Sequence, residues 1–279
     1  TCDSLTANVL KLEKKVWPNG NGPEYDAPRI NVNAVDSIRP GEYVIGKVGK
    51  IDGNLADVKI SGLEGHKASL KYENGLLKLV VAEMRNAGSV EWTGSVDGEW
   101  DLADKENFRS ADGSDVFVTG DTVTFNDNAT NTNVKITEPV QPKAIIFDNN
   151  TKDYTLSGAA VTGESQITKK GDAALTINNV SDFTGSVSLN GGTTKVATLG
   201  ATNGVNNGPF GYYTNRVTLN GGTLAPQASF TTSHPFAIGA NGGTIDVPAG
   251  VTMTMGNALT GDGNTLTKNG DGQLTMPGT

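Results

Sequence analysis

One eleven-residue segment occurs twice in this chain and constrains its fold more than any other feature. Residues 167–177 read ITKKGDAALTI and residues 266–276 read LTKNGDGQLTM, with Thr, Lys, Gly, Asp, Leu and Thr at equivalent positions. Apolar and polar residues alternate on both sides of a Gly-Asp step, which predicts a strand, a tight turn and a second strand. One such unit is too thin to bury its apolar face unless it stacks on neighbouring units. We therefore predict a repeat protein.

The four-residue motif Asn-Gly-Gly-Thr indicates the length of the repeat. It begins at Asn190, Asn220 and Asn241, so successive copies lie 30 and 21 residues apart. Ahead of this motif, short segments of alternating apolar and polar residues begin roughly every ten residues. This spacing is typical of a β-sandwich, and also of a β-helix in which each face of a turn contributes one strand. An interval of 21 residues is typical of one complete coil of a β-helix, and the interval of 30 residues is explained by an insertion. The spacing of the motif therefore favours the β-helix. The alternating segments are 122–125, 133–137, 143–147 and 154–156.

Composition agrees with thin layers of strands. Apolar residues make up 36% of the 279 residues, which is lean for a compact globule of this length. The 36 glycines are roughly twice the usual share, and many lie in Asn-Gly turn signals. Because no segment sustains a helical period, we predict an all-β fold.

The charge of the chain excludes two classes of partner. It has 22 basic and 30 acidic residues, a net charge of −8, which gives no basic footprint for nucleic acid or for an anionic bilayer. The longest apolar run, 76–82, contains Lys78 and is too short to span a membrane. We therefore expect neither a nucleic-acid partner nor membrane insertion.

The first 85 residues have longer strands and a higher charge density than the rest. We predict an N-terminal β region at 1–85, either a β-sandwich or the end of a preceding solenoid, and a β-solenoid repeat domain at 86–279 with an irregular lead-in at 86–115. Asn74-Gly75 predicts a type I′ hairpin turn. The buried face of this hairpin should contain Leu70, Tyr72, Leu77 and Leu79. The strands expected here are 8–16, 29–35, 42–48, 56–60, 68–72 and 76–82.

Two tryptophans, Trp92 and Trp100, flank an Asp97-Gly98 turn in the lead-in. They could stack across a hairpin or form an aromatic platform for a sugar ring, and burial is the favoured interpretation. Three acids stand beside them: Glu91, Glu99 and Asp101. Glycoside hydrolysis needs two carboxyl groups about 5–10 Å apart across a cleft. Charged residues beside exposed turns are usually solvated, so we do not expect catalysis here.

The segment 203–216 interrupts the repeat with a Gly- and Asn-rich insertion. Functional contacts on solenoids often lie in such insertions. Aromatic rings beside Asn and Arg suit stacking on sugars and hydrogen bonding to them. The alternative is that Tyr212 or Tyr213 caps the core where a coil is irregular. The candidate ligand-binding residues are Phe210, Tyr212, Tyr213 and Arg216.

The repeat region offers few residues for catalysis. Between Ser165 and Thr279 there is no glutamate. The aspartate and the lysine of the eleven-residue segment recur at equivalent positions, Asp172 with Asp271 and Lys169 with Lys268. This recurrence indicates that they are turn residues. A polysaccharide lyase needs a basic residue beside carboxylates, and the lysines here are scattered. We therefore predict no catalytic residue and no enzymatic activity.

We also expect no cofactor. Cys2 is the single cysteine and the chain has two histidines, so neither an intrachain disulfide nor the usual Cys/His zinc site can form. Asn- and Asp-rich turns could offer oxygen ligands to Ca²⁺, but they match no calcium loop, and solvated turns are the favoured interpretation. These turns are 126–131, 148–153 and 262–264.

Taken together, these motifs resemble the autotransporter-associated β-strand repeat of bacterial secreted and surface proteins. Residues 167–196 cover a whole unit, in which ITKKGDAALTI is followed by SDFTGSVSLNGGT, and the resemblance extends over about 88–279. Residues 197–216 and 224–238 depart from the pattern. The resemblance implies a right-handed parallel β-helix exported to the cell exterior.

The leading functional hypothesis is a non-catalytic, extracellular or cell-surface β-solenoid module of a bacterium. It would act as a stalk or adhesion scaffold that contacts polysaccharide or another surface protein. One alternative is a fragment of a carbohydrate-active enzyme, either a polysaccharide lyase or a glycosidase. Another is a self-assembling fibre subunit, because uncapped terminal coils can stack end to end into a homo-oligomer.

Overall fold

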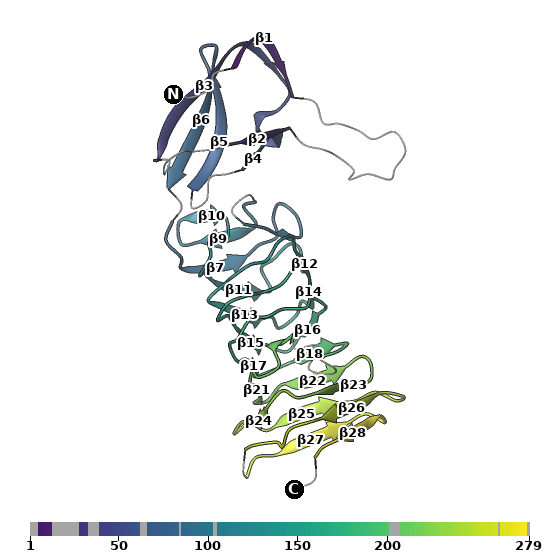
Figure 1. Ribbon diagram of the computed structural model, residues 1–279. Helices are drawn as coiled ribbons and strands as arrows, with labels where there is room; N and C mark the ends of the chain where they lie inside the picture. The colour runs from purple at the N-terminus through teal and green to yellow at the C-terminus, as the bar shows by residue number, and fades with distance from the viewer. Residues whose placement is uncertain are drawn as a thin grey trace. The chain divides into compact units, whose positions relative to one another are not determined.

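The computed structural model describes residues 5–12, 28–32, 39–61, 66–83, 85–102, 105–200, 207–261 and 263–277. The chain packs as two compact units, Thr1–Arg85 and Asn86–Thr279 (Figure 1). The described residues form strands and one short 3-10 helix, η1 (Leu55–Asp57), without an α-helix, so the prediction of an all-β fold is confirmed. Within these same residues no helix is long and apolar enough to cross a bilayer.

Unit 1 contains a four-stranded sheet in the order β1-β3-β6-β5. The hairpin between β5 and β6 turns at Asn74 and Gly75, whose φ angles are +52° and +77°. Two positive φ values in a two-residue turn are typical of type I′, as predicted. The bounds are β1 (Leu5–Lys11), β3 (Gly41–Asp52), β5 (His66–Glu73) and β6 (Leu76–Glu83), with a separate parallel pair β2 (Arg29–Asn31) and β4 (Lys59–Ser61).

One face of this sheet carries the apolar side chains of unit 1. Leu77 and Leu79 are buried, and they pair with Tyr72 and Leu70, which are half-buried on the same face. The strand predicted at 56–60 is partly wrong. There the side chain of Asn54 accepts the N–H of Ala56 and caps η1, so extended structure resumes only at β4. Residues 13–16 and 33–35 of two other predicted strands lie outside the described residues.

Unit 2 consists mainly of parallel strands in three sheets, between which the chain passes repeatedly (Figure 1). The first sheet contains β7 (Ser89–Trp92), β9 (Phe108–Ser110), β10 (Gly113–Asp115), β11 (Thr122–Asn126), β13 (Ala144–Asp148), β15 (Gln166–Lys170), β17 (Val187–Leu189), β21 (Val217–Leu219) and β24 (Phe236–Ile238). The second contains β8 (Glu99–Trp100), β12 (Asn133–Ile136), β14 (Tyr154–Gly158), β16 (Ala174–Ile177), β18 (Thr193–Val196), β22 (Thr223–Pro226), β25 (Gly243–Asp246) and β27 (Leu266–Asn269). The third contains β23 (Phe230–Thr232), β26 (Thr252–Met255) and β28 (Gln273–Thr275). The strands of these sheets are parallel except for β9 and β10, which pair antiparallel at one edge of the first sheet, and the parallel pairing is consistent with a β-helix.

The register of the first sheet explains the alternating sequence pattern. Successive strands place every second side chain in one continuous inward row, because side chains alternate between the two faces of a strand. One row runs Val123, Ile145, Ile167, Val187, Val217 and Phe236, all buried. The next inward row runs Phe125, Phe147, Lys169, Leu189, Leu219 and Ile238. The four strands predicted between residues 122 and 156 match β11, β12, β13 and β14 closely.

The two sequence motifs occupy corners between the sheets. All three Asn-Gly-Gly-Thr copies lie between the first and second sheets, and Thr193, Thr223 and Thr244 stack in register. The eleven-residue segment behaves differently. Its first copy joins the first sheet to the second through β15 and β16, whereas its second copy joins the second sheet to the third through β27 and β28. The segment therefore turns the chain between two different pairs of sheets.

An aromatic cluster fills the start of unit 2. Trp92 and Trp100 are both fully buried, so burial is confirmed, but the predicted stacking across a hairpin is wrong. The two residues lie in the first and second sheets, on β7 and β8. Phe108 packs between them, with ring centroids 5.1 Å from Trp92 and 5.8 Å from Trp100. Trp100 also contacts Phe117 at 5.2 Å.

Phe147 tests the packing of the inward rows. Its ring is fully buried and stacks on Phe125 with centroids 4.7 Å apart and planes inclined by 16°. We expect Phe147→Ala to lower the free energy of unfolding of unit 2 by about 3–5 kcal/mol, because it removes buried apolar area and leaves a cavity. Chemical denaturation followed by tryptophan fluorescence measures this. Val180→Ala is the control, since Val180 is 55% exposed and should change stability little.

Candidate functional site

The insertion between β18 and β21 is built around two buried residues. Phe210 is fully buried and belongs to the core of unit 2, so its ring is not at the surface. The buried Asn215 donates from Nδ2 to the carbonyl oxygens of Phe183 and Phe210 at 2.7 and 2.9 Å. Part of the insertion forms a small hairpin of β19 (Asn207–Gly208) and β20 (Gly211–Tyr212). Residues 201–206 lie outside the described residues.

Gly211 explains why this hairpin can approach the coil beneath it. Its φ is +75°, a backbone conformation that favours glycine. A Cβ at this position would lie 2.6 Å from Nδ2 of Asn215 and even closer to the carbonyl oxygen of Phe183. The same carbonyl accepts the N–H of Tyr212 at 2.9 Å. Glycine therefore allows the backbone contact that places Tyr212 at the surface.

Tyr212, Tyr213 and Arg216 form the outward part of the insertion, which we call the tyrosine platform. The two tyrosines are half-buried, with ring centroids 4.8 Å apart and planes inclined by 51°. Arg216 is exposed just before β21. Among the described residues, no hydrogen bond or ion pair engages the Tyr212 and Tyr213 hydroxyls or the Arg216 guanidinium. Three of the four residues predicted to bind ligand are thus accessible, and Phe210 is not.

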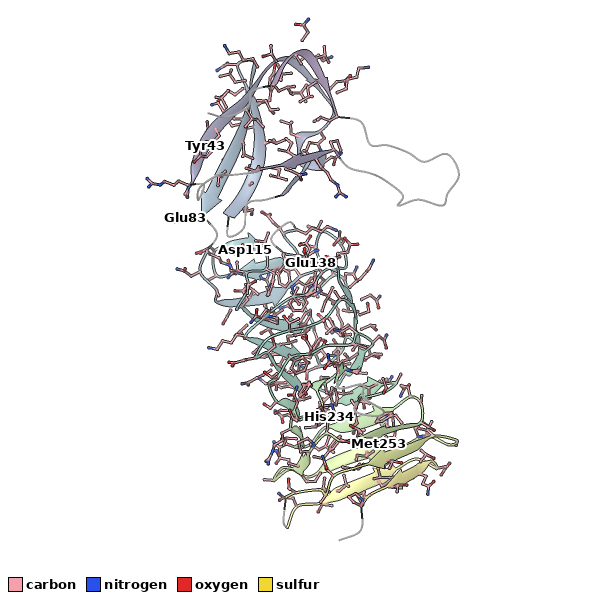
Figure 2. All side chains as sticks on the ribbon, in the orientation of Figure 1. Tyr43, Glu83, Asp115, Glu138, His234 and Met253 are labelled. Carbon is pink, nitrogen blue, oxygen red and sulfur yellow. The ribbon has the colours of Figure 1, made fainter. Side chains whose placement is uncertain are left out.

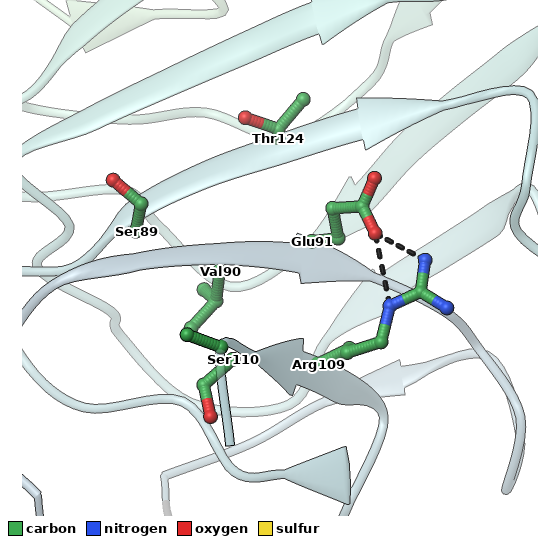
Figure 3. A pocket seen from close by; sticks show the side chains of 7 residues that line it. Ser89, Val90, Glu91, Arg109, Ser110 and Thr124 are labelled. Carbon is green, nitrogen blue, oxygen red and sulfur yellow. Dashed lines mark hydrogen bonds and ion pairs between the residues drawn. The ribbon is translucent and has the colours of Figure 1, made fainter. Parts of the chain in front are cut away.

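The acids beside the tryptophans are held by basic side chains. Figure 3 shows Glu91 paired with Arg109 at one side of a shallow hollow between β7, β9 and β11. Hydrogen bonding to Arg109 lowers the pKa of Glu91, and Asn126 Nδ2 also donates to this carboxylate. The residues lining the hollow are Ser89, Val90, Glu91, Arg109, Ser110, Ala111 and Thr124.

The other two acids lie apart from this hollow. Glu99 on β8 pairs with Lys105, which also binds Asp97 at 2.5 Å. Asp101 is 7% exposed, and its Oδ1 accepts the N–H of Lys105 at 3.2 Å. A general acid for glycoside hydrolysis needs a raised pKa, whereas the pKa of Glu91 is lowered. This arrangement does not favour a glycosidase site.

Asp127 connects one coil to the next. Its carboxylate accepts the backbone N–H groups of Asn150, Thr151 and Lys152 at 2.9–3.2 Å. These hydrogen bonds, with that of Thr151 the largest influence, lower the pKa of Asp127 from 3.8 to about 2. Asp153 similarly accepts the N–H of Ala174 at 2.7 Å. Within the described part of the chain, no cluster of three or more His, Cys, Asp or Glu could hold a metal ion, and calcium binding at these turns stays a prediction.

Lys169 is not only a turn residue. It occupies an inward row between Phe147 and Leu189 and is fully buried. Its Nζ donates to the carbonyl oxygen of Gly171 at 2.8 Å and to that of Lys170. Burial lowers the pKa of Lys169 to about 8. Lys268, at the equivalent position, donates to the Gly270 carbonyl at 2.5 Å, so the same local hydrogen bond recurs in the second copy, although Lys268 is exposed.

Sequence reasoning missed His234, which lies against the insertion. It is fully buried, and its ring packs against Phe210 with centroids 6.4 Å apart. The signal in the sequence was weak, since a single histidine between Ser and Pro carries no periodicity. Its relation to the insertion depends on packing between successive coils, which the local pattern does not encode.

Comparison with known proteins gives one informative similarity. The chain is 29% identical over 239 residues to the protein "Adhesin BmaC autotransporter" of Brucella suis biovar 1 (strain 1330). The match covers 84% of this chain but 7% of that protein, so the chain spans a small part of its relative's length. No family model matches the chain, and no solved structure matches it.

Asp127 provides a pH-dependent test of the contacts between coils. Because its folded pKa is lowered, the carboxylate stabilises the fold above about pH 4 and loses this effect as the pH falls through about 2. We expect Asp127→Asn to cost about 1 kcal/mol at pH 5, less than the full change in pKa implies because solvent screens this carboxylate. The difference from wild type should shrink towards pH 2. Chemical denaturation at several pH values measures the difference.

Asp271→Asn is the matched control for Asp127→Asn. Asp271 is an exposed turn acid, and no hydrogen bond to its carboxylate is found within the described structure. Its substitution should change stability little at any of these pH values. Equal effects of the two substitutions would show that the Asp127 contacts do not stabilise the coil.

Proposed function

We propose that this chain is a passenger segment of a bacterial adhesin, exposed on the cell surface or secreted, and that unit 2 is its β-solenoid scaffold. The observation that carries the proposal is the in-register stacking of parallel strands from successive coils, which builds a rigid support. The similarity to an autotransporter adhesin supports the same role. A right-handed parallel β-helix of autotransporter-associated repeats fits both observations.

The proposed role is non-catalytic. Glu91 and Glu99 near the tryptophans form ion pairs, and Lys169 is buried with its ammonium group on backbone carbonyls. Neither arrangement leaves a free acid and base facing a common substrate space. We therefore expect no release of unsaturated products from uronic-acid polysaccharides.

We infer further that the scaffold contacts polysaccharide through the tyrosine platform. Half-buried aromatic rings present an apolar face while their hydroxyl groups remain able to form hydrogen bonds, a combination that suits sugar rings. The exposed guanidinium of Arg216 can bind a carboxylate in a bidentate manner. This chemistry favours acidic polysaccharides over neutral ones.

Affinity gel electrophoresis tests the platform. The wild-type chain should be retained by gels containing alginate or pectate more strongly than by gels containing dextran. The double variant Tyr212→Ala/Tyr213→Ala should bind about tenfold more weakly, because each aromatic contact contributes about 0.5–1.5 kcal/mol. Arg216→Gln should weaken retention by alginate and pectate but not by dextran.

Tyr43→Ala is the matched control, since it removes a half-buried tyrosine from β3 in unit 1 and leaves unit 2 unchanged. Circular dichroism should show that all the variants are folded. Undiminished retention of the double variant, or a wild-type chain that no acidic gel retains, would rule out the platform as a polysaccharide site.

A further inference from the structure

His234 joins the two flanks of the insertion. It lies between β23 and β24, in the coil that follows the insertion, and is labelled on the ribbon of unit 2 in Figure 2. Its Nδ1 is 3.0 Å from the carbonyl oxygen of Asn215, and its Nε2 is 3.2 Å from that of Leu199. Leu199 and Asn215 stand on opposite flanks of the insertion, and both are buried. One side chain from the next coil therefore fastens both ends of this segment.

The ring nitrogens of His234 face two acceptors. A neutral imidazole has one N–H and one lone pair, so it donates to only one carbonyl at a time. An imidazolium would donate to both, but it would bring a full charge into a buried site. Which form persists in the folded chain depends on the groups around the ring.

The surroundings of His234 do not compensate a positive charge. Burial is the largest influence and lowers its pKa, while the hydrogen bonds to Asn215 and Leu199 act in the opposite direction. Among the described residues, no carboxylate contributes to this balance. The titratable and charged groups on the elements packed against the ring are Asp182, Lys195, Tyr212, Tyr213 and Arg216. Residues 201–206 contain no ionisable side chain.

We propose that His234 is a positioning residue that holds the β19–β20 hairpin and the tyrosine platform in place while its imidazole is neutral, and releases them when acid protonates it. The protonated ring gains solvation only if the contacts to Leu199 and Asn215 open. Phe210 and Asn215, which anchor the hairpin, pack directly beside the ring, so opening loosens them too.

The direction of the pH effect follows from the lowered pKa. The released imidazole has an ordinary pKa of about 6.5, and the held imidazole has a lower one. The released state therefore binds more protons than the held state. The contacts by which His234 fastens the insertion, which we call the clamp, therefore weaken as the pH falls from about 6.5 through the pKa of the held imidazole. Above about pH 7 the clamp is at full strength.

Amide hydrogen exchange tests the clamp without any ligand. The reporters are the N–H groups of Tyr212, bonded to Phe183, and of Asn215, bonded to Tyr212. After correction for intrinsic exchange, their protection should fall by up to about tenfold for each pH unit below about 6.5. The amide of Thr155, bonded to Thr132 in a distant coil, should keep its protection. NMR titration in a His66→Gln background follows His234 as the single remaining histidine.

His234→Gln provides the matched variant, because its amide can donate to a carbonyl but does not titrate. Protection at Tyr212 and Asn215 should be independent of pH in this variant. Should it fail to fold, the wild-type titration decides: a His234 that titrates above about pH 6.5 overturns the proposal. Protection that stays constant between about pH 7.5 and 5 also overturns it. Because the readout is exchange, the outcome does not depend on polysaccharide binding.

Discussion

Hydrogen bonds between successive coils are the constraint on which unit 2 depends. In a parallel sheet, a strand finds its backbone partners in the strands before and after it, and here these belong to neighbouring coils. The corners follow the same rule. Asp127 caps the turn at Asn150, and the side chain of Asn220 accepts the N–H of Asn241 in the next coil. A single coil would leave most of its polar backbone unpaired, so stability arises only from the stack.

This stacking also explains how polar residues are accommodated inside unit 2. Lys169 fills its place in an apolar row with its aliphatic stem, while its ammonium group reaches the carbonyls of the adjacent corner. Gly192 in the next coil leaves room for it, since a Cβ there would lie 2.8 Å from Nζ. His234 and Asn215 serve the insertion in a similar way, by satisfying carbonyls that the irregular segment leaves outside the strand ladder.

The sequence predicted the elements well because alternation and turn residues are local signals. Such signals predict the Asn74-Gly75 turn and the strands between 122 and 156. Sheet assignment was harder. Trp92 and Trp100 look like hairpin partners locally, yet a corner places them in different sheets. The burial of Phe210 and the position of His234 depend on contacts between coils, which a period of two residues does not encode.

The central claim is that adjacent coils stack in the register described, and disulfide trapping tests it most directly. Thr168 and Ser188 are outward-facing partners on β15 and β17, and Thr218 follows Ser188 on β21. In a Cys2→Ser background, Thr168→Cys/Ser188→Cys should form an intrachain disulfide rapidly, because paired strands lie about 4.8 Å apart. Thr168→Cys/Thr218→Cys should not, since its cysteines stand about twice as far apart. Equal cross-linking of the two pairs, or cross-linking of only the second, would contradict the stacked-coil account.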